Sequence, residues 1–149
     1  MEDHCLFFDG ASKGNPSIVG VGGILLNPNG NITLRFAWGL GQEPNNKVEA
    51  LALWQGIRLA LSQNIRSLTV FGDSRIIMQS VATRKPPIQV HITLLVKKIR
   101  AMIVKFQNFK IYHILRSLNG LADYQANSGT LLSRGYLVVD GTTTWCSVP

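Results

Sequence analysis

A change in hydrophobic period near Pro44 constrains the fold more than any other feature of this sequence. Before it, the apolar residues form short runs of the kind found in β-strands. Three such runs are present, at residues 5–8, 19–26 and 32–38. Residues 27–30 (NPNG), between the second and third runs, have turn chemistry at hairpin length. The first third of the chain therefore predicts an antiparallel meander.

Beyond Pro44 the apolar residues recur at helical spacing, which predicts a long helix through about Gln63, with Asn45 or Asn46 as its cap. Strands and helices then alternate. The expected segments are a strand at 68–71, helices at 74–82 and 90–106, a strand at 110–115 and a helix at 121–133. This order favours an α/β fold with a five-stranded mixed sheet. Three strands are expected to be antiparallel and two parallel, with right-handed crossovers and helices on both faces.

The length of 149 residues and the apolar fraction of 46% fit one domain with one core. We expect that domain over residues 1–135 and a C-terminal tail over residues 136–149. The longest apolar stretch, residues 18–26, is far shorter than the roughly 20 residues that a membrane span needs. The acidic N-terminus lacks the pattern of a secretion signal. We therefore expect an intracellular protein of the cytoplasm or nucleus that does not associate with membranes, with Cys5 and Cys146 as free thiols.

Fifteen basic and eight acidic residues give the chain a net charge of +7. The excess arises because carboxylates are few, and not because lysines are many. A globular chain with this balance most often binds a polyanion, nucleic acid before an anionic membrane, although a basic surface that is simply solvated stays open as an alternative. Nucleic acid is the expected partner class, and the position of each acid becomes informative.

Four of the eight acids are expected at the ends of strands and helices. Asp9 is placed at the end of the first strand, Asp73 at the end of the fourth strand, and Asp123 at the start of the last helix. Ligands of open α/β sheets gather at the carboxyl ends of strands near the topological switch point, so Asp9 and Asp73 should be neighbours. Glu49 is expected in the first turn of the long helix, on a face with the small residue Gly56. A helix with small residues there can lie close to the sheet and bring Glu49 toward Asp9.

Four converging carboxylates predict a site for divalent cations. Like charges raise one another's pKa unless a cation neutralises them, and hard oxygen ligands favour Mg²⁺ or Mn²⁺. Two such ions, about 4 Å apart, can activate a water molecule and stabilise the departing oxygen in phosphodiester hydrolysis. The alternative is that each acid is a helix cap or dipole partner. That alternative suits Asp73 or Asp123 alone, but it does not explain Asp9 inside an apolar segment.

Four motifs, in this order, resemble those of type 1 ribonuclease H. They are residues 8–16 (FDGASKGNP), 49–53 (EALAL), 73–74 (DS) and 113–123 (HILRSLNGLAD). The short arginine-containing loop before Ala122 and Asp123 is similar to the archaeal-type form found in plant retroelement polyproteins and plant RNase H-like proteins. The resemblance covers about residues 5–134. Each motif alone would be weak, but the four in order are specific.

The resemblance implies an RNase H-like fold and a catalytic site in which Asp9, Glu49, Asp73 and Asp123 hold two Mg²⁺ ions, with Mn²⁺ able to substitute. It implies cleavage of the RNA strand of RNA/DNA hybrids, which leaves 5′-phosphate and 3′-hydroxyl ends. Because the chain begins almost at the first strand and ends in a short tail, we expect it to be fused to a reverse transcriptase in its full-length context.

The resemblance also assigns substrate-binding residues by position. They are Gly10, Ala11, Asn15, Asn45, Asn46 and Arg116. The three asparagines stand where relatives place amides that contact both strands in the minor groove, including 2′-hydroxyl groups. Their alternative roles are a turn residue for the first and a helix cap for the other two. Gly10 and Ala11 would offer backbone groups to the RNA, and Arg116 is the charged group in a loop where many relatives carry glycine and histidine.

Two other functions stay open from the sequence. One is a non-catalytic nucleic-acid-binding module with the same fold, which loss of an acid would favour, although none of the four is missing. The other is a structure-selective nuclease such as a junction resolvase, which the run at residues 8–16 disfavours. Duplex nucleic acids other than the hybrid are further candidate ligands.

Overall fold

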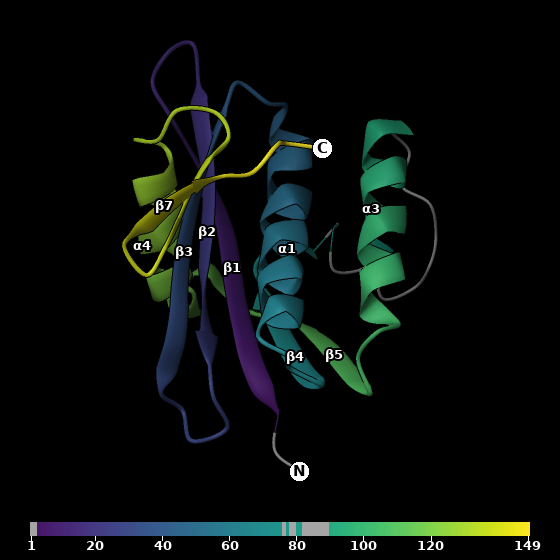
Figure 1. Ribbon diagram of the computed structural model, residues 1–149. Helices are drawn as coiled ribbons and strands as arrows, with labels where there is room; N and C mark the ends of the chain where they lie inside the picture. The colour runs from purple at the N-terminus through teal and green to yellow at the C-terminus, as the bar shows by residue number, and fades with distance from the viewer. Residues whose placement is uncertain (1–2, 76, 78–79, 82–89) are drawn as a thin grey trace.

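The computed structural model describes residues 3–75, 77, 80–81 and 90–149, and these form a mixed β-sheet with helices on both faces (Figure 1). Its strands are β1 (His4–Lys13), β2 (Ile18–Leu26), β3 (Ile32–Gly41), β4 (Ser67–Gly72), β5 (Asn108–His113), β6 (Tyr136–Val139) and β7 (Thr142–Trp145). Its helices are α1 (Asn45–Ser62), α3 (Val90–Ile103) and α4 (Gly120–Gly129), with a short 3₁₀ turn, η1 (Arg116–Leu118). The strand order within the described residues is β5-β4-β1-β2-β3-β6-β7.

The predicted α/β class and the five predicted strands are confirmed. Strands β1, β2 and β3 are antiparallel, and β4 and β5 continue the sheet in parallel beyond β1. The predicted end of the first strand at Asp9 is wrong. The strand continues to Lys13 because residues 9–13 pair with residues 18–22 of β2 in an antiparallel ladder. Asp9 therefore lies within β1, where it pairs with Gly22 of β2.

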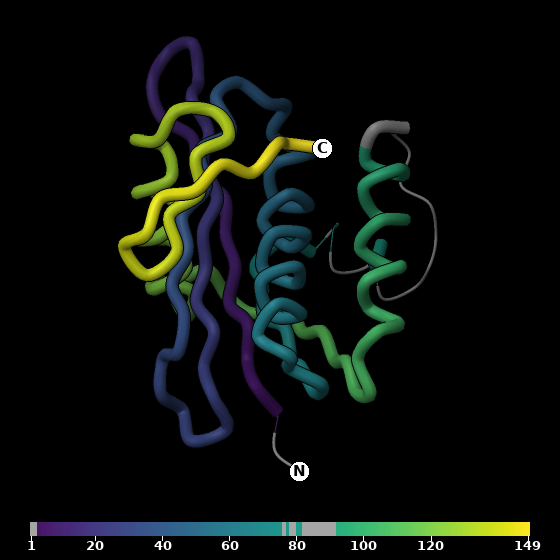
Figure 2. Tube along the Cα trace, viewed as in Figure 1, coloured from purple at the N-terminus to yellow at the C-terminus, as the bar shows by residue number. Residues whose placement is uncertain are grey.

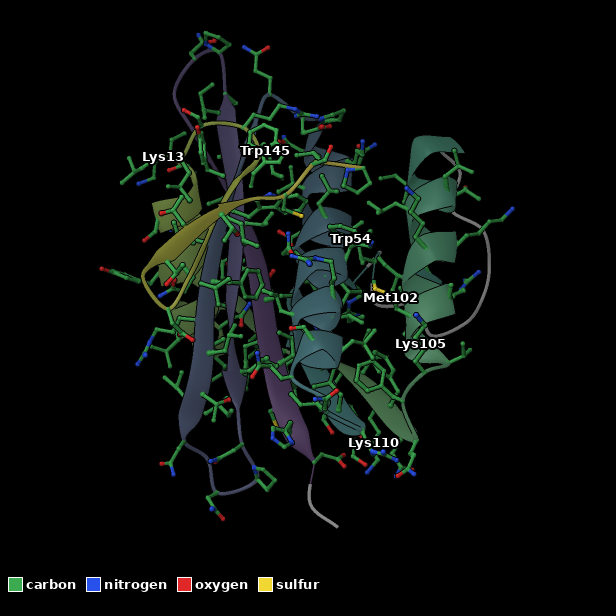
Figure 3. The ribbon with its side chains drawn as sticks, viewed as in Figure 1. Lys13, Trp54, Met102, Lys105, Lys110 and Trp145 are labelled. Atoms are coloured by element: carbon green, nitrogen blue, oxygen red, sulfur yellow. The ribbon has the colours of Figure 1, made fainter. Side chains whose placement is uncertain are left out.

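The segment predicted as a tail adds two strands, so the sheet has seven strands and not five. Strand β6 pairs with β3, and β7 pairs with β6. Figure 3 shows Trp145 on β7, where its ring meets that of Tyr136 edge-on at 5.6 Å. All four residues of β7 are exposed, so neither face carries the apolar alternation by which a strand is recognised in a sequence.

The last residues cross from the sheet to α1, which explains why the C-terminus ends beside that helix (Figure 2). The indole N–H of Trp38 donates to the Cys146 carbonyl at 3.2 Å, and Lys47 Nζ donates to the Pro149 carbonyl at 3.0 Å. Gln55 Nε2, fully buried, contacts the Cys146 sulfur at 3.4 Å. These contacts tie the C-terminal segment to β3 and to α1.

Helix boundaries differ from the predictions in three places. Pro44 is the N-cap of α1 and no side chain caps that helix, so neither Asn45 nor Asn46 has the capping role. Glu49 consequently lies one turn further into α1 than the expected first turn. Helices α3 and α4 end earlier than expected, at Ile103 and Gly129. The predicted helix at 74–82 lies partly outside the described residues. Among the described residues, no helix is long and apolar enough to cross a membrane.

Helices α1 and α4 cover opposite faces of the sheet (Figure 1). On one face, α1 is buried between the strands and α3, and its residues 50–53 (ALAL) are all fully buried. On the other face, glycines allow α4 to lie directly on β2. A Cβ atom built on Gly22 would lie 2.4 Å from the carbonyl carbon of Gln125, and one built on Gly20 would lie 2.3 Å from that of Gly129.

Gly22→Ala should therefore displace α4 and destabilise the domain. Overpacking of this kind costs about 1–3 kcal/mol, which corresponds to a fall in melting temperature of roughly 3–10 °C for a chain of this size. Gly120→Ala is the control, because a Cβ atom at that position has nothing within 4 Å. Equal melting temperatures of Gly22→Ala and the parent protein, measured by circular dichroism, would contradict the close packing of α4 on β2.

Candidate active site

The parallel pairing of β1 and β4 brings Asp9 and Asp73 together. Phe7 is opposite Phe71 in this pair, so Asp9 and Asp73, each two residues further along, come level with each other. Asp9 is only 4% exposed, whereas Asp73 follows the last residue of β4 and is partly buried. The predicted neighbourhood of these two acids is thus present, at the switch point between antiparallel and parallel strands.

Glu49 reaches the same place from α1. The Gly10 N–H donates to Asp9 Oδ1 at 2.9 Å and to Glu49 Oε1 at 3.2 Å, so one backbone group orients both carboxylates. A Cβ atom on Gly10 would lie 2.5 Å from Val48 Cγ1 and 3.1 Å from Glu49 Oε1. Because Gly10 has no side chain, α1 can bring the Glu49 carboxylate into contact with β1.

Asp9, Glu49 and Asp73 form a compact set of oxygen ligands. One carboxylate oxygen from each lies within 4.8 Å of the others. Glu49 Oε2 is buried and has no hydrogen-bond partner. A buried carboxylate oxygen without a partner is costly, and a cation among the three side chains would satisfy it. The residues present therefore fit a divalent cation with hard oxygen ligands.

The raised pKa values of Asp9 and Glu49 also support a cation site. The pKa of Asp9 is raised from 3.8 to about 7, first by burial and then by the charge of Asp73. The pKa of Glu49 is raised from 4.5 to about 8, first by burial and then by the charges of Asp9 and Asp73. The Gly10 N–H and, more weakly, the charge of Arg116 oppose this rise at Glu49. Near neutral pH the ion-free site therefore holds protons that a cation would displace.

Asp123, the fourth predicted carboxylate, lies beside this set and not within it. It is exposed in the first turn of α4, the helix that packs on β1 and β2. Its carboxyl group lies close enough to Asp9 to contribute to the rise in the pKa of Asp9. The fold thus assembles all four predicted acids, three in mutual contact distance and Asp123 on the exposed side.

Next to the carboxylates, a shallow cavity of about 230 Å³ collects most of the predicted substrate-binding residues. It is lined by Gly10, Ala11, Ser12, Val19, Asn45, Val48, Glu49 and Arg116. Asn45 lies at its edge as the exposed first residue of α1. Because the Gly10 N–H is already engaged by Asp9 and Glu49, its predicted contact with RNA would have to use another backbone atom.

Two predicted substrate-binding residues lie outside this cavity. Asn15 is exposed in the loop between β1 and β2, and Asn46 is exposed in the first turn of α1. His113, which the sequence placed in a strand, is the last residue of β5. The roles of Asn15 and Asn46 toward RNA stay predictions.

A family model described as reverse transcriptase-like matches residues 7–129. The chain belongs to this family. The match includes all four carboxylates and the cavity residues, and it confirms the resemblance to ribonuclease H that the motifs indicated.

Individual relatives of this reverse transcriptase-like domain are named as ribonuclease H proteins. It is 29% identical over 127 residues to a ribonuclease HI of Halobacterium salinarum, covering 81% of this chain and 61% of that protein. It is 27% identical over 128 residues to a putative ribonuclease H protein of Arabidopsis thaliana, covering 86% of this chain and 20% of that protein. The chain thus spans less than two thirds of the length of either curated relative.

Solved structures share the fold. The crystal structure of RNase H1 from Halobacterium salinarum has a TM-score of 0.80 at 26% identity, covering 85% of this chain and 96% of that one. LC11-RNase H1, isolated from compost and solved in complex with an RNA/DNA hybrid, has a TM-score of 0.77 at 22% identity, with coverages of 86% and 96%. The RNase H-like fold expected from the sequence is confirmed.

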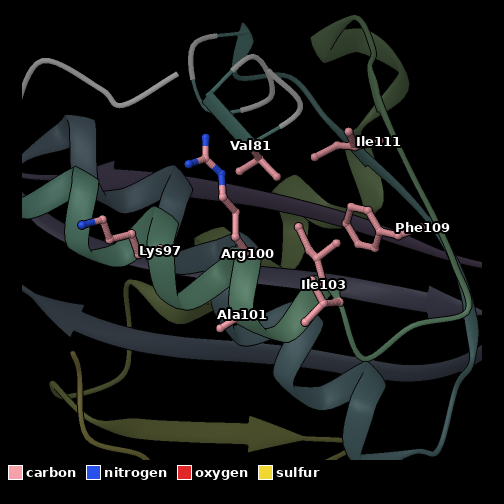
Figure 4. Close-up of a pocket in the computed structure, with 8 residues that line it drawn as sticks. Val81, Lys97, Arg100, Ala101, Ile103, Phe109 and Ile111 are labelled. Atoms are coloured by element: carbon pink, nitrogen blue, oxygen red, sulfur yellow. The ribbon is translucent and has the colours of Figure 1, made fainter. Parts of the chain in front are cut away.

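A larger cavity of this reverse transcriptase-like domain, about 600 Å³, lies between α3 and β5 (Figure 4). Apolar side chains such as Phe109 and Ile111 line it together with Lys97 and Arg100, and none of the four carboxylates does. Basic side chains are also spread over the surface, since Lys13 lies at the opposite end of the molecule from Lys105 and Lys110 (Figure 3). The candidate site is therefore identified by its carboxylates and not by the size of a cavity or by a single basic patch.

Asn119 is a functional candidate to which the sequence alone assigns no role. Asn119 lies inside the fourth motif and precedes α4, a position where asparagine is usually explained as a cap. In the structure its side chain makes no capping bond and instead contacts β1 and Asp73. The only signal in the sequence was its place four residues before Asp123.

Proposed function

We propose that this domain is a divalent-metal-dependent endoribonuclease that hydrolyses the RNA strand of RNA/DNA hybrids. The observation that carries the proposal is the set of three carboxylates whose ligand oxygens lie within 4.8 Å of one another, beside Asp123. Membership of the family and the likeness to proteins named ribonuclease H support the reaction class.

In this mechanism Asp9, Glu49 and Asp73 would hold Mg²⁺, and Asp123 would complete the site from α4. Two bound divalent ions supply an activated water molecule and stabilisation of the departing oxygen in phosphodiester hydrolysis. The protein's own contribution is positioning. The Gly10 N–H fixes one oxygen of Asp9 and one of Glu49, and burial keeps Asp9 out of bulk water, which strengthens its electrostatic interactions. Arg116, which lines the cavity, provides a positive charge that acts on Glu49 and can face a phosphate.

The shallow cavity supports recognition of the RNA strand. The exposed amide of Asn45 lies at its edge, within a site that Glu49 also lines. An amide can donate to and accept from a 2′-hydroxyl group, which is the group that distinguishes RNA from DNA. One relative with this fold was solved in complex with an RNA/DNA hybrid, which agrees with the proposed substrate.

Asn45→Ala should lower kcat/KM on the hybrid by about 2- to 13-fold, the effect of losing one uncharged hydrogen bond. Because Pro44 is the N-cap and no side chain caps α1, the melting temperature should stay almost unchanged. Isothermal titration with Mg²⁺ should also give the parental affinity. Parental turnover together with a melting temperature lower by several degrees would show that Asn45 has only a structural role.

A reverse transcriptase is the proposed full-length context. The family model is described as reverse transcriptase-like, and the chain spans 20% of the length of the Arabidopsis relative. Both facts agree with a domain that works beside others in a longer polypeptide.

A cleavage assay tests the proposed function. Labelled RNA/DNA hybrid, duplex RNA, duplex DNA and single-stranded RNA are incubated with the protein in Mg²⁺, in Mn²⁺ or in EDTA. We expect cleavage of the RNA strand of the hybrid with either ion, none in EDTA, and products with 5′-phosphate ends. Binding of the hybrid without cleavage in either ion would instead identify a non-catalytic nucleic-acid-binding module.

A further inference from the structure

Asn119 is one of few polar side chains in the core of the described residues, with 1% of its surface exposed. It is the residue before α4, yet its side chain makes no capping hydrogen bond to that helix. A buried amide loses its bonds to water, so its position is favourable only where other groups replace them. The partners of Asn119 therefore indicate what the residue does.

Those partners connect three of the elements that carry the carboxylates. Nδ2 donates to the Phe8 carbonyl at 2.9 Å, directly before Asp9 in β1, and makes a longer hydrogen bond of 3.5 Å to Asp73 Oδ2. The backbone carbonyl of Asn119 accepts from the Asp123 N–H at 3.0 Å. One residue thus joins the middle of β1, the end of β4 and the first turn of α4.

From these contacts we propose that Asn119 is a positioning residue that holds Asp73 in its ion-binding orientation against β1. Asp73 lies just beyond the last residue of β4, where no ladder hydrogen bond of that strand restrains it. An amide donor suits the task because it orients a carboxylate without neutralising its charge. A lysine or arginine in the same place would form an ion pair and compete with a divalent cation.

The other end of the amide indicates a function beyond packing. Oδ1 of Asn119 is buried and has no hydrogen-bond partner. An unsatisfied buried acceptor lowers stability, and an apolar residue would avoid that loss. The amide must therefore be favoured for the hydrogen bonds that its Nδ2 donates to the Phe8 carbonyl and to Asp73.

This inference rests on the proposed divalent-ion site, so the test first measures binding of Mn²⁺ and Mg²⁺ to the parental domain by isothermal titration, without substrate. Asn119→Ala is then expected to weaken ion affinity by about tenfold or more and to lower kcat, while KM for the hybrid changes less than twofold. The matched control is Asn127→Ala, which removes an amide hydrogen bond from the same helix, between Nδ2 and the Asp123 carbonyl. The control should bind the ions like the parent.

A double-mutant cycle separates positioning from general stability. If Asn119 acts through Asp73, adding Asn119→Ala to Asp73→Asn should leave the ion affinity of the single Asp73→Asn variant unchanged within about twofold. Should Asn119→Ala fail to fold, Asn119→Ser takes its place in the cycle, because serine is favoured before a helix and is too short to span both acceptors.

The outcomes distinguish the inference from the function on which it rests. Parental ion affinity in folded Asn119→Ala or Asn119→Ser, with only a lower melting temperature, would overturn the positioning role. Additive losses in the cycle would overturn it too. Failure of the parental domain to bind either ion would instead refute the proposed function.

Discussion

Replacing Asp9 with asparagine is expected to abolish RNA cleavage while making the ion-free protein more stable at pH 8. The substitution keeps the shape of the side chain and an oxygen that can accept from the Gly10 N–H. It removes one charge from a set in which the pKa of Asp9 is raised to about 7 by burial and by Asp73. Loss of the ion site should lower the cleavage rate by about 10³-fold or more, the equivalent of several kcal/mol of transition-state stabilisation.

The gain in stability follows from the same electrostatics. At pH 8 the parental Asp9 is mostly ionised and buried beside other acids, which opposes folding. Relieving about 1–2 kcal/mol of this repulsion should raise the melting temperature in EDTA by roughly 2–8 °C. Added Mg²⁺ should stabilise the parent but not the variant.

Asp140→Asn is the matched control for Asp9→Asn. Asp140 is exposed, far along the chain at the turn between β6 and β7, and its Oδ1 accepts from the Arg35 N–H at 2.9 Å, as an asparagine oxygen can. Its φ of 48° is one that asparagine also adopts readily. Cleavage at the parental rate is expected. If Asp9→Asn cleaved the hybrid as fast as Asp140→Asn, Asp9 would not belong to the active site.

In EDTA the melting temperature of the parental domain should fall as the pH rises from 5 to 8. Asp9 and Glu49 have pKa values of about 7 and about 8 in the folded state, against ordinary values of 3.8 and 4.5. The folded state therefore binds more protons than the unfolded state over this range. Stability contributed by the protonated carboxyls is complete below pH 4 and is lost as the pH rises through 7 and 8. Since one pKa unit corresponds to about 1.4 kcal/mol, a loss of at least about 2 kcal/mol, or roughly 4–8 °C, is expected.

Divalent ions should reverse this loss, because they replace the protons as the charges that neutralise the site. Thermal melts at pH 5, 6, 7 and 8, each with EDTA and with Mg²⁺, measure both effects. The Asp9→Asn, Glu49→Gln double variant is the control and should show a flatter profile with little response to Mg²⁺. If the melting temperature of the parental domain in EDTA stayed constant from pH 5 to pH 8, the pKa values of Asp9 and Glu49 would not be raised in the folded state.

The convergence of the four acids in space could be predicted from the sequence. Asp9, Glu49, Asp73 and Asp123 were selected because so few acids are present and because each had a definable place on a strand or helix. The fold brings Asp9, Glu49 and Asp73 together and puts Asp123 beside Asp9. Parallel pairing of β1 with β4 was implied by the order of elements alone, and that pairing is what makes Asp9 and Asp73 neighbours.

Predictions failed where the deciding contact lies far away in the chain. The strand carrying Asp9 was ended too early because its extension depends on pairing with β2. Strand β7 was missed because its exposed threonines form no apolar face, and β6 was missed because its pairing with β3 joins segments about 100 residues apart. Asn119 was missed because its side chain bonds to Phe8, 111 positions earlier.

By itself, the sequence determined five of the seven strands, the helices α1, α3 and α4, the α/β class of the fold, and which four acids are candidates for the site. These follow from local periodicity and from motifs, since the physical preferences behind them act over a few residues. Tertiary structure alone decided how deeply Asp9 is buried, how far the pKa values of Asp9 and Glu49 rise, and which amide holds Asp73. These properties depend on solvent exclusion and on distances between groups from different elements, which exist only once the chain has folded.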